Sequence, residues 1–556
     1  MRGYPPPLVH QQTHRPSPSG GGLHGLEIYV PVRAVAWLPV GVRHYDPFEH
    51  APERLAPWNA RLDGRTDRLI THPGRMSHTP PVSHRPLPAR RHRRRPARGR
   101  VRPGPALRRP AARRPLDRQL NPEEEPISTH SLIDRHRAAL PPWSPLSYRK
   151  PLELVSGHGC TVRGGDGRDY LDFYSGVAAN LLGYDAAPVR EAVERQLRTG
   201  ILHTSTFYLI RSQVELAERV ARVSGIDDAV VFFTCSGTEA VETALLLATE
   251  YQRSRHVVAL RDSYHGRSFG AVAVSGDKRW QGTGLSPLCV DHVPAAPEHG
   301  ENDQHHVALC VQELEDLIDA APGRGIAALI AEPVQGVAGS VPLAEGQLAA
   351  YAHVLRDRGA LLICDEVLTG WGRTGRFWGH QWDEGVHPDL LVFAKGAAGG
   401  LTLGGVVGRR EVMSSLPMPS ISTFGGNPLS TAAAVATLDF IVEHDLPTRA
   451  ARAGQGLRGL LTRGLAGLAS VRRVQGRGLL LGVAFQDPAT GVPCAEVAAA
   501  VQEECRNLGL LVGLGGSAGH CVRVMPPLTL TDEEVRRGAA LLTAASREVD
   551  RCRNST

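Results

Sequence analysis

Short apolar runs that end in glycine or a charged residue recur through the middle of the chain. The two clearest cover residues 361–364, which Asp365 follows, and residues 390–394, which Lys395 follows. Runs of this length, bounded in this way, are typical of strands buried on both faces of a parallel sheet. Further runs of the same kind lie at residues 229–234, 257–260 and 326–331.

Amphipathic segments separate these runs and predict helices. Residues 212–223 carry apolar side chains at helical spacing, and residues 343–358 form the expected crossover helix before the Asp365 strand. The 33 residues from Glu332 to Asp365 and the 30 from Asp365 to Lys395 suit strand–helix–strand units. This alternation predicts an α/β fold built on a large, mostly parallel sheet.

The same patterns divide the chain into four segments. Residues 1–125 keep neither a helical nor an alternating period, and residues 126–210 include a predicted β-hairpin around an Asp-Gly turn. Residues 211–445 hold the repeated strands and helices of a large domain. Residues 446–556 predict a smaller α+β domain, to which the segment 126–210 is expected to contribute.

Composition changes the picture mainly for residues 1–125. The stretch from residue 81 to 118 contains fourteen arginines and one acid, so the net charge of +7 leaves −6 for the rest of the chain. We expect a disordered basic extension, because it cannot bury enough apolar surface to offset its ordering entropy. A start codon placed too far upstream would also produce such a segment. Nucleic-acid binding by the arginines is the weaker interpretation, since no aromatic residues interleave them.

The cysteines and the apolar stretches indicate a soluble, globular protein in a reducing compartment. The nine cysteines are scattered and form no CxxC pair, which predicts neither a zinc site nor a disulfide framework and fits the cytoplasm. The most apolar stretch near the start, residues 26–42, is interrupted by charges and prolines, so no membrane span is expected.

Asp365 and Lys395 are the first candidate site residues. Ligands in open α/β sheets bind beyond the carboxyl ends of the strands, so this acid and this amine are expected to face one crevice. Pyridoxal phosphate (PLP) needs a lysine for its Schiff base and a carboxylate beside its ring nitrogen. Taken singly, each residue is more commonly a solvated loop charge or a helix cap, so the prediction depends on further positions agreeing.

Two more loops are consistent with a PLP site. Gly237 and Thr238 lie in a tight turn between a strand and a helix, where unpaired backbone N–H groups suit one phosphate. Tyr264 follows another strand and can stack on a planar ring, although packing on the rim of the sheet is the plainer interpretation.

With these residues in view, the chain resembles the class III, or ω-type, aminotransferases of PLP fold type I from about Leu132 to Arg547. The resemblance is closest to the alanine–glyoxylate, β-amino-acid and bacterial "aspartate aminotransferase family" types. Its motifs are YLDFYSG, CSGTEAVETALLLA, YHGRSFGAVAVSG, IAEPVQG, ICDEVLTGWGRTG, FAKG, STFGGNPLS, GRGLLLGV and VRVMPPLTL.

This resemblance implies a role for each matching residue. Lys395 would bind the cofactor covalently, Asp365 would pair with its ring nitrogen, and Tyr264 would stack on the ring. Thr423 would reach the phosphate bound by a neighbouring subunit, which implies a homodimer with shared sites. The implied residues are Lys395, Asp365 and Glu332 as catalytic residues, Gly237, Thr238, Tyr264 and Thr423 around the cofactor, and Arg523 for the substrate carboxylate.

Three residues depart from the family pattern. Leu368 replaces a glutamine whose amide hydrogen-bonds the cofactor, a loss of about 1–3 kcal/mol if nothing substitutes. Cys235 replaces an asparagine. Val337 stands where the γ-aminobutyrate and ornithine branch has a glutamate, which argues against that branch.

The predicted function is transfer of an amino group between an amino acid, such as β-alanine, alanine or another ω-amino acid, and a 2-oxo acid by ping-pong kinetics. Two alternatives stay open. Another fold type I PLP enzyme, a mutase or decarboxylase, would use the same lysine and aspartate. A degraded homologue acting as a binding protein would explain Leu368.

Overall fold

The computed structural model describes residues 129–281, 286–297, 303–321 and 325–554, together with four short strands between residues 12 and 57. The chain divides into two compact units, Met1–Leu116 and Asp117–Thr556, which are described separately.

The described part of the first unit is a four-stranded antiparallel sheet. Its strands are β1 (Gln12–His14), β2 (Glu27–Val32), β3 (Gly41–Asp46) and β4 (Ala51–Pro57). These strands were not predicted, because prolines and charged residues such as Pro31, Arg43 and Glu53 interrupt their apolar positions. The rest of the predicted extension 1–125, including its arginine-rich stretch, lies outside the described residues.

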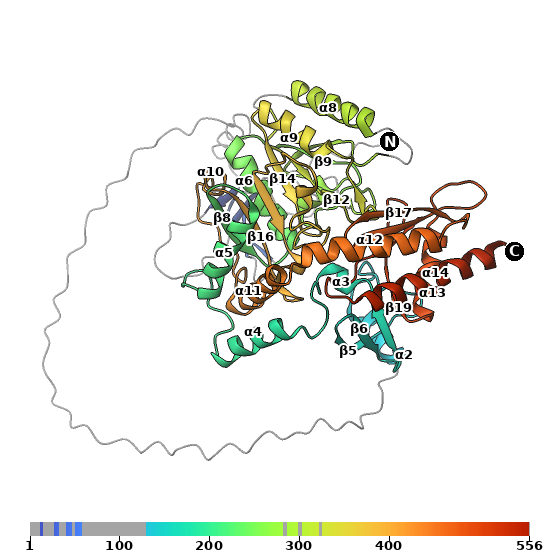
Figure 1. The fold of residues 1–556 in the computed structure, drawn as a ribbon. Coiled ribbons are helices and arrows are strands. Elements are labelled where there is room, and N and C mark those ends of the chain that lie inside the picture. Colours follow the sequence, from blue (N-terminus) through green and yellow to red (C-terminus); the bar gives the residue numbers. More distant parts are fainter. Residues whose placement is uncertain are drawn as a thin grey trace, which may run out of the picture. The chain divides into compact units, whose positions relative to one another are not determined.

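A seven-stranded sheet forms the centre of the second unit (Figure 1), with the order β10-β9-β11-β14-β15-β16-β8. Five neighbouring strands, from β10 to β15, run parallel, whereas β16 is antiparallel to both of its neighbours. The predicted mostly parallel sheet is therefore confirmed. Its strands are β8 (Ala229–Thr234), β9 (His256–Leu260), β10 (Cys289–Val293), β11 (Ala328–Ala331), β14 (Leu361–Asp365), β15 (Leu390–Phe393) and β16 (Gly404–Arg409).

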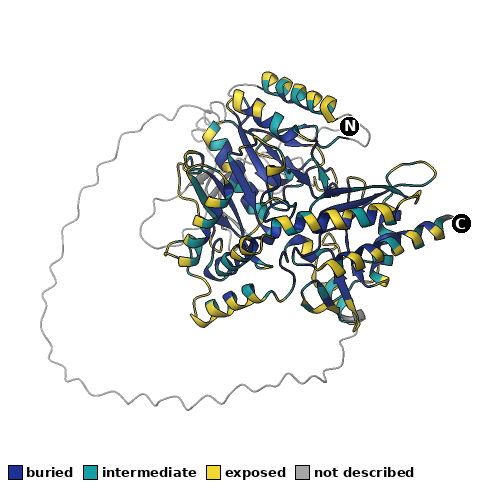
Figure 2. Cartoon of the chain, in the orientation of Figure 1, coloured by how far each residue is buried: buried dark blue, intermediate teal, exposed yellow. Residues whose placement is uncertain are grey.

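Helices cover both faces of this sheet, which explains its continuous apolar runs. Alternate residues of β14 point to opposite faces: Leu361 and Ile363 share an apolar cluster with α6, whereas Leu362 and Cys364 share one with α9. Figure 2 shows the strands buried while the helices around them turn exposed faces outward. The helices of this layer are α5 (Arg211–Ser224), α6 (Gly237–Gln252), α7 (Phe269–Val274), α8 (Asp303–Ala320), α9 (Gln347–Asp357), α10 (Arg410–Met413) and α11 (Pro428–Glu443).

One predicted helix starts later than expected. The predicted helix 343–358 begins at Gln347, because Gly346 takes a left-handed φ of 78° before it. Helix α8 was not among the predicted elements.

Two smaller sheets complete the unit. One, in the order β17-β18-β21-β20, is antiparallel, and in the other β19 pairs in parallel with β7 of the predicted hairpin. Residues far apart in sequence therefore share a sheet. The strands are β5 (Leu154–His158), β6 (Thr161–Gly164), β7 (Asp169–Asp172), β17 (Val471–Arg477), β18 (Leu480–Phe485), β19 (Leu510–Leu511), β20 (Gly513–Gly515) and β21 (Cys521–Val524), with a separate pair β12 (Val334–Gln335) and β13 (Val341–Pro342).

Long helices pack against these smaller sheets. Helices α12 (Leu446–Gly464) and α14 (Asp532–Asn554) lie side by side and extend toward the C-terminus (Figure 1). The segment boundaries predicted at residues 125, 210 and 445 stay predictions. The remaining elements are α2 (Thr129–Ala139), α3 (Ser175–Ala178), α4 (Ala187–Arg198), α13 (Ala495–Asn507) and the 3₁₀ turns η1 (Gly379–Trp382) and η2 (Lys395–Ala398).

The segment after β7 was not predicted to leave the strand conformation at once. It forms a short left-handed turn, α3, over residues 175–178. Among the described helices, none is long and apolar enough to cross a membrane.

Candidate active site

A cavity of about 440 Å³ opens at the carboxyl ends of the central strands. The loops after five strands supply its polar side chains, as ligand sites in such sheets require. These loops carry Cys235 to Thr238 after β8, Tyr264 to Gly266 after β9, Glu332 after β11, Asp365 at the end of β14, and Lys395 after β15; Arg523 joins them from β21.

Asp365 is held rigidly at the floor of this cavity. It is 4% exposed, its Oδ1 accepts the Val367 N–H at 3.0 Å, and its Oδ2 lies 2.7 Å from Nδ1 of His265. His265 is also buried, and its Nε2 has no partner within the described residues. The pair therefore fixes the direction of the carboxylate. Sequence reasoning missed His265, although it directly follows Tyr264 in the YHG motif.

Lys395 begins the 3₁₀ turn η2 directly after β15, and its backbone takes a left-handed φ of 44°. Its amine makes no hydrogen bond or ion pair with the described residues. Burial lowers the pKa of Lys395 to about 8, an effect that nearby Asp365 opposes and Arg523 reinforces. About a tenth of this amine is therefore uncharged at neutral pH, compared with well below 1% for an ordinary lysine, and the uncharged form is the one that acts as a nucleophile or base.

Glu332 connects two loops of the cavity. It is buried, and its two oxygens accept the N–H groups of Tyr264 and Gly336, each at 2.9 Å. Burial raises the pKa of Glu332 above its ordinary value. Its geometry suits positioning of the loops, since both oxygens are occupied by backbone donors. Tyr264 lines the cavity, and its ring centroid lies 5.2 Å from that of Trp280 in an edge-to-face arrangement.

The N-terminus of α6 supplies donors for an anion. Ser236 caps this helix by accepting the Glu239 N–H at 3.2 Å, while Gly237 and Thr238 line the cavity. The first N–H groups of a helix have no partner inside it. A Cβ on Gly237 would lie 2.9 Å from the Val367 side chain, so only glycine fits this close approach.

Arg523 is a buried cation without an acid. It is 4% exposed, and no carboxylate of the described residues pairs with it. Its Nη2 lies 3.5 Å from the Met525 sulfur, its Nε has no partner, and its Cζ lies 5.9 Å from the centroid of the Tyr174 ring. Burying a charge in this way is costly unless a ligand of opposite charge completes the site.

The departures from the family pattern have different surroundings. Leu368 lines the cavity and packs with Val334, Leu480 and Met525, so its place is filled by apolar contacts. Cys235 also lines the cavity: its backbone N–H donates to the Glu239 carboxylate at 2.8 Å, and its thiol lies 3.9 Å from the Ser422 hydroxyl.

Thr423 is the one predicted site residue that the structure leaves outside this cavity. It is exposed on a loop beside Phe424, whose ring lies 4.5 Å from His203. The other predicted residues, Lys395, Asp365, Glu332, Gly237, Thr238, Tyr264 and Arg523, all line the cavity.

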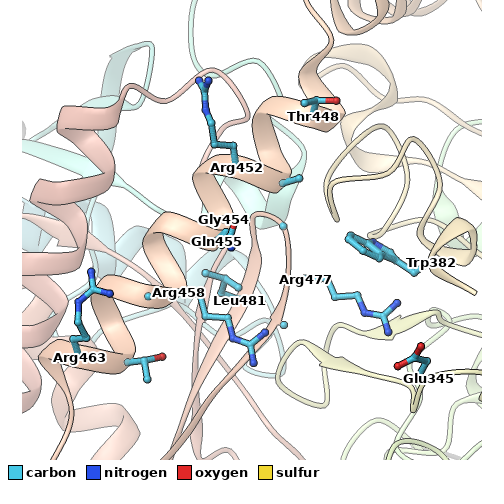
Figure 3. A pocket seen from close by; sticks show the side chains of 15 residues that line it. Glu345, Trp382, Thr448, Arg452, Gly454, Gln455, Arg458, Arg463, Arg477 and Leu481 are labelled. Carbon is cyan, nitrogen blue, oxygen red and sulfur yellow. The ribbon is translucent and has the colours of Figure 1, made fainter.

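A second, larger cavity of about 1010 Å³ lies along α12 (Figure 3). Arg452, Arg458 and Arg463 of that helix line it, and all three are exposed to solvent. Figure 3 shows Arg477 between Trp382 and Glu345 on the other side. This cavity contains no buried amine and acid together, so its chemistry differs from that of the Lys395 cavity.

The aminotransferase class-III family model matches residues 146–545. The chain belongs to the class III aminotransferases. It is a PLP-dependent enzyme of fold type I, as the resemblance implied.

Relatives within this family carry different names. The chain is 37% identical to acetylornithine aminotransferase of Corynebacterium efficiens, over 72% of this chain and 94% of that protein. It is 34% identical to the mitochondrial alanine–glyoxylate aminotransferase 2 homolog 2 of Arabidopsis thaliana, over 73% and 85% of the two chains. Among solved structures, an (S)-enantioselective ω-transaminase from Thermomicrobium roseum is 32% identical, with a TM-score of 0.70 over 76% of this chain and 98% of that one.

The residues present fit PLP. A lysine amine with a lowered pKa, a rigid aspartate, an aromatic ring and free helix N–H groups line one cavity. These groups meet the needs of an aldehyde, a ring nitrogen, a planar ring and a phosphate, respectively.

Proposed function

We propose that this enzyme transfers an amino group between an amino acid, with β-alanine, alanine and other ω-amino acids as candidates, and a 2-oxo acid by a ping-pong mechanism. The observation that carries the proposal is the unpaired amine of Lys395 in one cavity with Asp365 and the acid-free Arg523. One small substrate can therefore be within reach of the reactive amine of Lys395, the carboxylate of Asp365 and the guanidinium of Arg523.

Lys395 is the proposed proton carrier. When bound, PLP supplies an aldehyde that takes up the amino group and a ring that accepts the electron pair left on the substrate carbon. The lowered pKa of the Lys395 amine increases its uncharged fraction, and in this form it removes the proton from that carbon and returns it elsewhere. Its left-handed backbone, directly after a buried strand, places the amine at the cavity instead of in the sheet.

Asp365 is the proposed partner of the ring nitrogen. Its charge favours a protonated ring, and the bonds from Val367 and His265 keep it oriented without reorganisation. Gly237 and Thr238 are proposed to hold the phosphate at the start of α6, and Tyr264 to stack on the ring. Glu332 is proposed to act by holding the Tyr264 loop.

Arg523 is the proposed receptor of the substrate carboxylate, because a guanidinium binds a carboxylate with two parallel hydrogen bonds. Val337 and Leu368 line the same cavity with apolar surface. An acid at residue 337 would compete for Arg523, and valine does not. This supports the alanine–glyoxylate or ω-amino-acid type over the ornithine type.

A homodimer with shared sites is proposed from exposed apolar loops. Phe207, Tyr208 and Leu209 are exposed, Leu209 at 98%, and the contact between His203 and Phe424 joins their loop to the one that carries Thr423. Such a surface is typical of a protein interface. Covering it would bring Thr423 to the phosphate of the partner subunit's site.

A cytoplasmic location is proposed from the nine cysteines, none of which forms a disulfide in the described part of the chain. The name of one relative places that protein in mitochondria, so the location of this enzyme needs direct measurement by fractionation.

The absorbance spectrum of the purified enzyme tests the proposed function. A visible band from bound PLP should shift to the pyridoxamine form when β-alanine or alanine is added, and pyruvate should restore it. Lys395→Ala should lose the overall reaction by a factor of about 10³ or more. Full activity in Lys395→Ala would refute the assignment.

The same spectra separate the two alternatives. A band that changes with an amino acid while carbon dioxide or an isomerised amine is released would indicate a decarboxylase or mutase. A protein that stays colourless with added PLP would favour a degraded binding protein, for which Leu368 is the specific observation.

A further inference from the structure

The turn α3 has a backbone that side chains rarely adopt. Its residues from Ser175 to Ala178 all have positive φ, between 50° and 63°. Non-glycine residues visit this region singly and seldom in a row, because Cβ approaches the following carbonyl oxygen. Only Gly176 is suited to it, while Val177 is β-branched. Something outside the turn must therefore stabilise it.

Asp172 is the side chain that holds this turn. It is 3% exposed at the end of β7, and its Oδ1 accepts the N–H groups of Tyr174 at 2.7 Å and Ser175 at 3.1 Å. Its Oδ2 accepts the Tyr184 hydroxyl at 2.7 Å. Three charge-assisted hydrogen bonds thus converge on one buried carboxylate at the entrance of the turn.

The beginning of the turn lies on the strands that carry Arg523. A Cβ added to Gly513 would lie 2.0 Å from the Tyr174 ring, and Gly513 pairs directly with Arg523 across β20 and β21. The N–H of Met525 also donates to the Phe173 carbonyl at 2.7 Å. The position of Tyr174, whose ring lies near the Arg523 guanidinium, therefore depends on the backbone that Asp172 fixes.

The residues that directly follow the turn pack against the loop that carries Lys395. A Cβ on Gly396 would be 3.0 Å from Leu181, and one on Gly400 would be 2.6 Å from the Asn180 amide oxygen. These contacts are made by residues beyond the turn, which also bond elsewhere: Leu528 donates to the Leu181 carbonyl at 2.8 Å. Loosening Asp172 should consequently affect Arg523 more than Lys395.

We propose that Asp172 is a positioning residue for substrate recognition: it holds the left-handed turn, and the turn fixes Tyr174 against the strand pair that aims Arg523 at the substrate carboxylate. This inference rests on the proposed function of Arg523. Asp172 lies outside the cavity lining and touches none of the reacting groups.

Steady-state kinetics of the holoenzyme with pyruvate as acceptor test the inference. Asp172→Ala should raise KM about tenfold or more, with kcat reduced less than about threefold and the PLP band retained. Asp172→Asn keeps an oxygen for the two N–H groups and an amide for Tyr184, so it should stay within about threefold of wild type. Tyr184→Phe removes one bond and should raise KM about two- to threefold.

Asp169→Asn is the matched control. Asp169 begins the same strand and is exposed, and among the described residues its side chain pairs with Arg163 alone, so its loss should leave KM unchanged. An unchanged KM in Asp172→Ala, or equal losses in all kinetic constants and in the PLP band, would overturn the inference. If Asp172→Ala does not fold, Tyr184→Phe decides: an unchanged KM in that variant would overturn it.

Failure of the proposed function can be told apart from failure of the Asp172 inference, because the wild-type enzyme itself would then not transaminate. The dissociation constant of pyruvate, measured by calorimetry, would then test Asp172: Asp172→Ala should still raise it about tenfold, and an unchanged value would overturn the inference.

Discussion

The cavity at Lys395 and the larger cavity along α12 both contain arginines, but the two hold them differently. Arg523 is buried without an acid, whereas Arg452, Arg458 and Arg463 project from one helix into solvent. Water stabilises the exposed guanidinium groups, so nothing demands a ligand there. Arg523 has little access to water, and a bound carboxylate would supply the missing partner. A buried polar group without a partner therefore distinguishes the Lys395 cavity from the α12 cavity better than cavity volume does.

After Lys395→Ala, the largest effect should come from Asp365→Asn. Asparagine preserves the shape and the bond from Val367 but removes the charge beside the ring nitrogen, so kcat should fall about 10²- to 10³-fold. Asp291→Asn is the control, since Asp291 also pairs with a histidine, His256, at 2.6 Å but outside the cavity. Equal activities of the two variants in a pyruvate assay would contradict the assigned role.

The pH dependence of stability tests the surroundings of Lys395. Its pKa falls from an unfolded value of 10.5 to about 8 in the fold. Between these values the unfolded chain binds more protons, so the free energy of unfolding of the apoenzyme should rise with pH. The full gain is about 3 kcal/mol. The free energy of unfolding of Lys395→Met, measured with urea, should lack this increase. If it rises with pH equally in both proteins, the fold does not lower the pKa of the Lys395 amine.

Arg523→Gln compares the two cavities directly. Removing the buried receptor should raise the KM for pyruvate about 30-fold, or about 2 kcal/mol, with the PLP band retained. Arg458→Gln changes an exposed arginine of the α12 cavity and should leave KM within about twofold. A larger effect of Arg458→Gln would mean that the α12 cavity takes part in recognition.

Leu368→Gln should have the smallest effect. The new amide can donate a hydrogen bond inside the Lys395 cavity but loses apolar contacts with Val334 and Met525. We expect PLP to bind about fivefold more tightly, or about 1 kcal/mol. Leu368→Met keeps the apolar volume and serves as the control in a fluorescence titration. Weaker PLP binding by Leu368→Gln would show that the packing of Leu368 contributes more than the amide can.

The sequence by itself determined the large sheet and most of the site. Apolar runs of strand length predicted β14 and β15, because strands buried on both faces need no polar alternation. Asp365 and Lys395 stand at the ends of those strands, so the topology of a parallel sheet was enough to bring them together. The apolar runs are a local signal in the sequence, and the rule that parallel strands end at the same edge of the sheet does the rest.

The tertiary structure alone decided the supporting contacts. The pairing of His265 with Asp365 spans 100 positions, and the pairing of β19 with β7 joins the two ends of the folded unit. No local pattern encodes such long-range partners. The left-handed turn α3 was not predicted, because three of its four residues have no preference for that conformation. Its backbone is imposed by the buried Asp172 carboxylate and by packing against distant strands, and these exist only once the chain has folded.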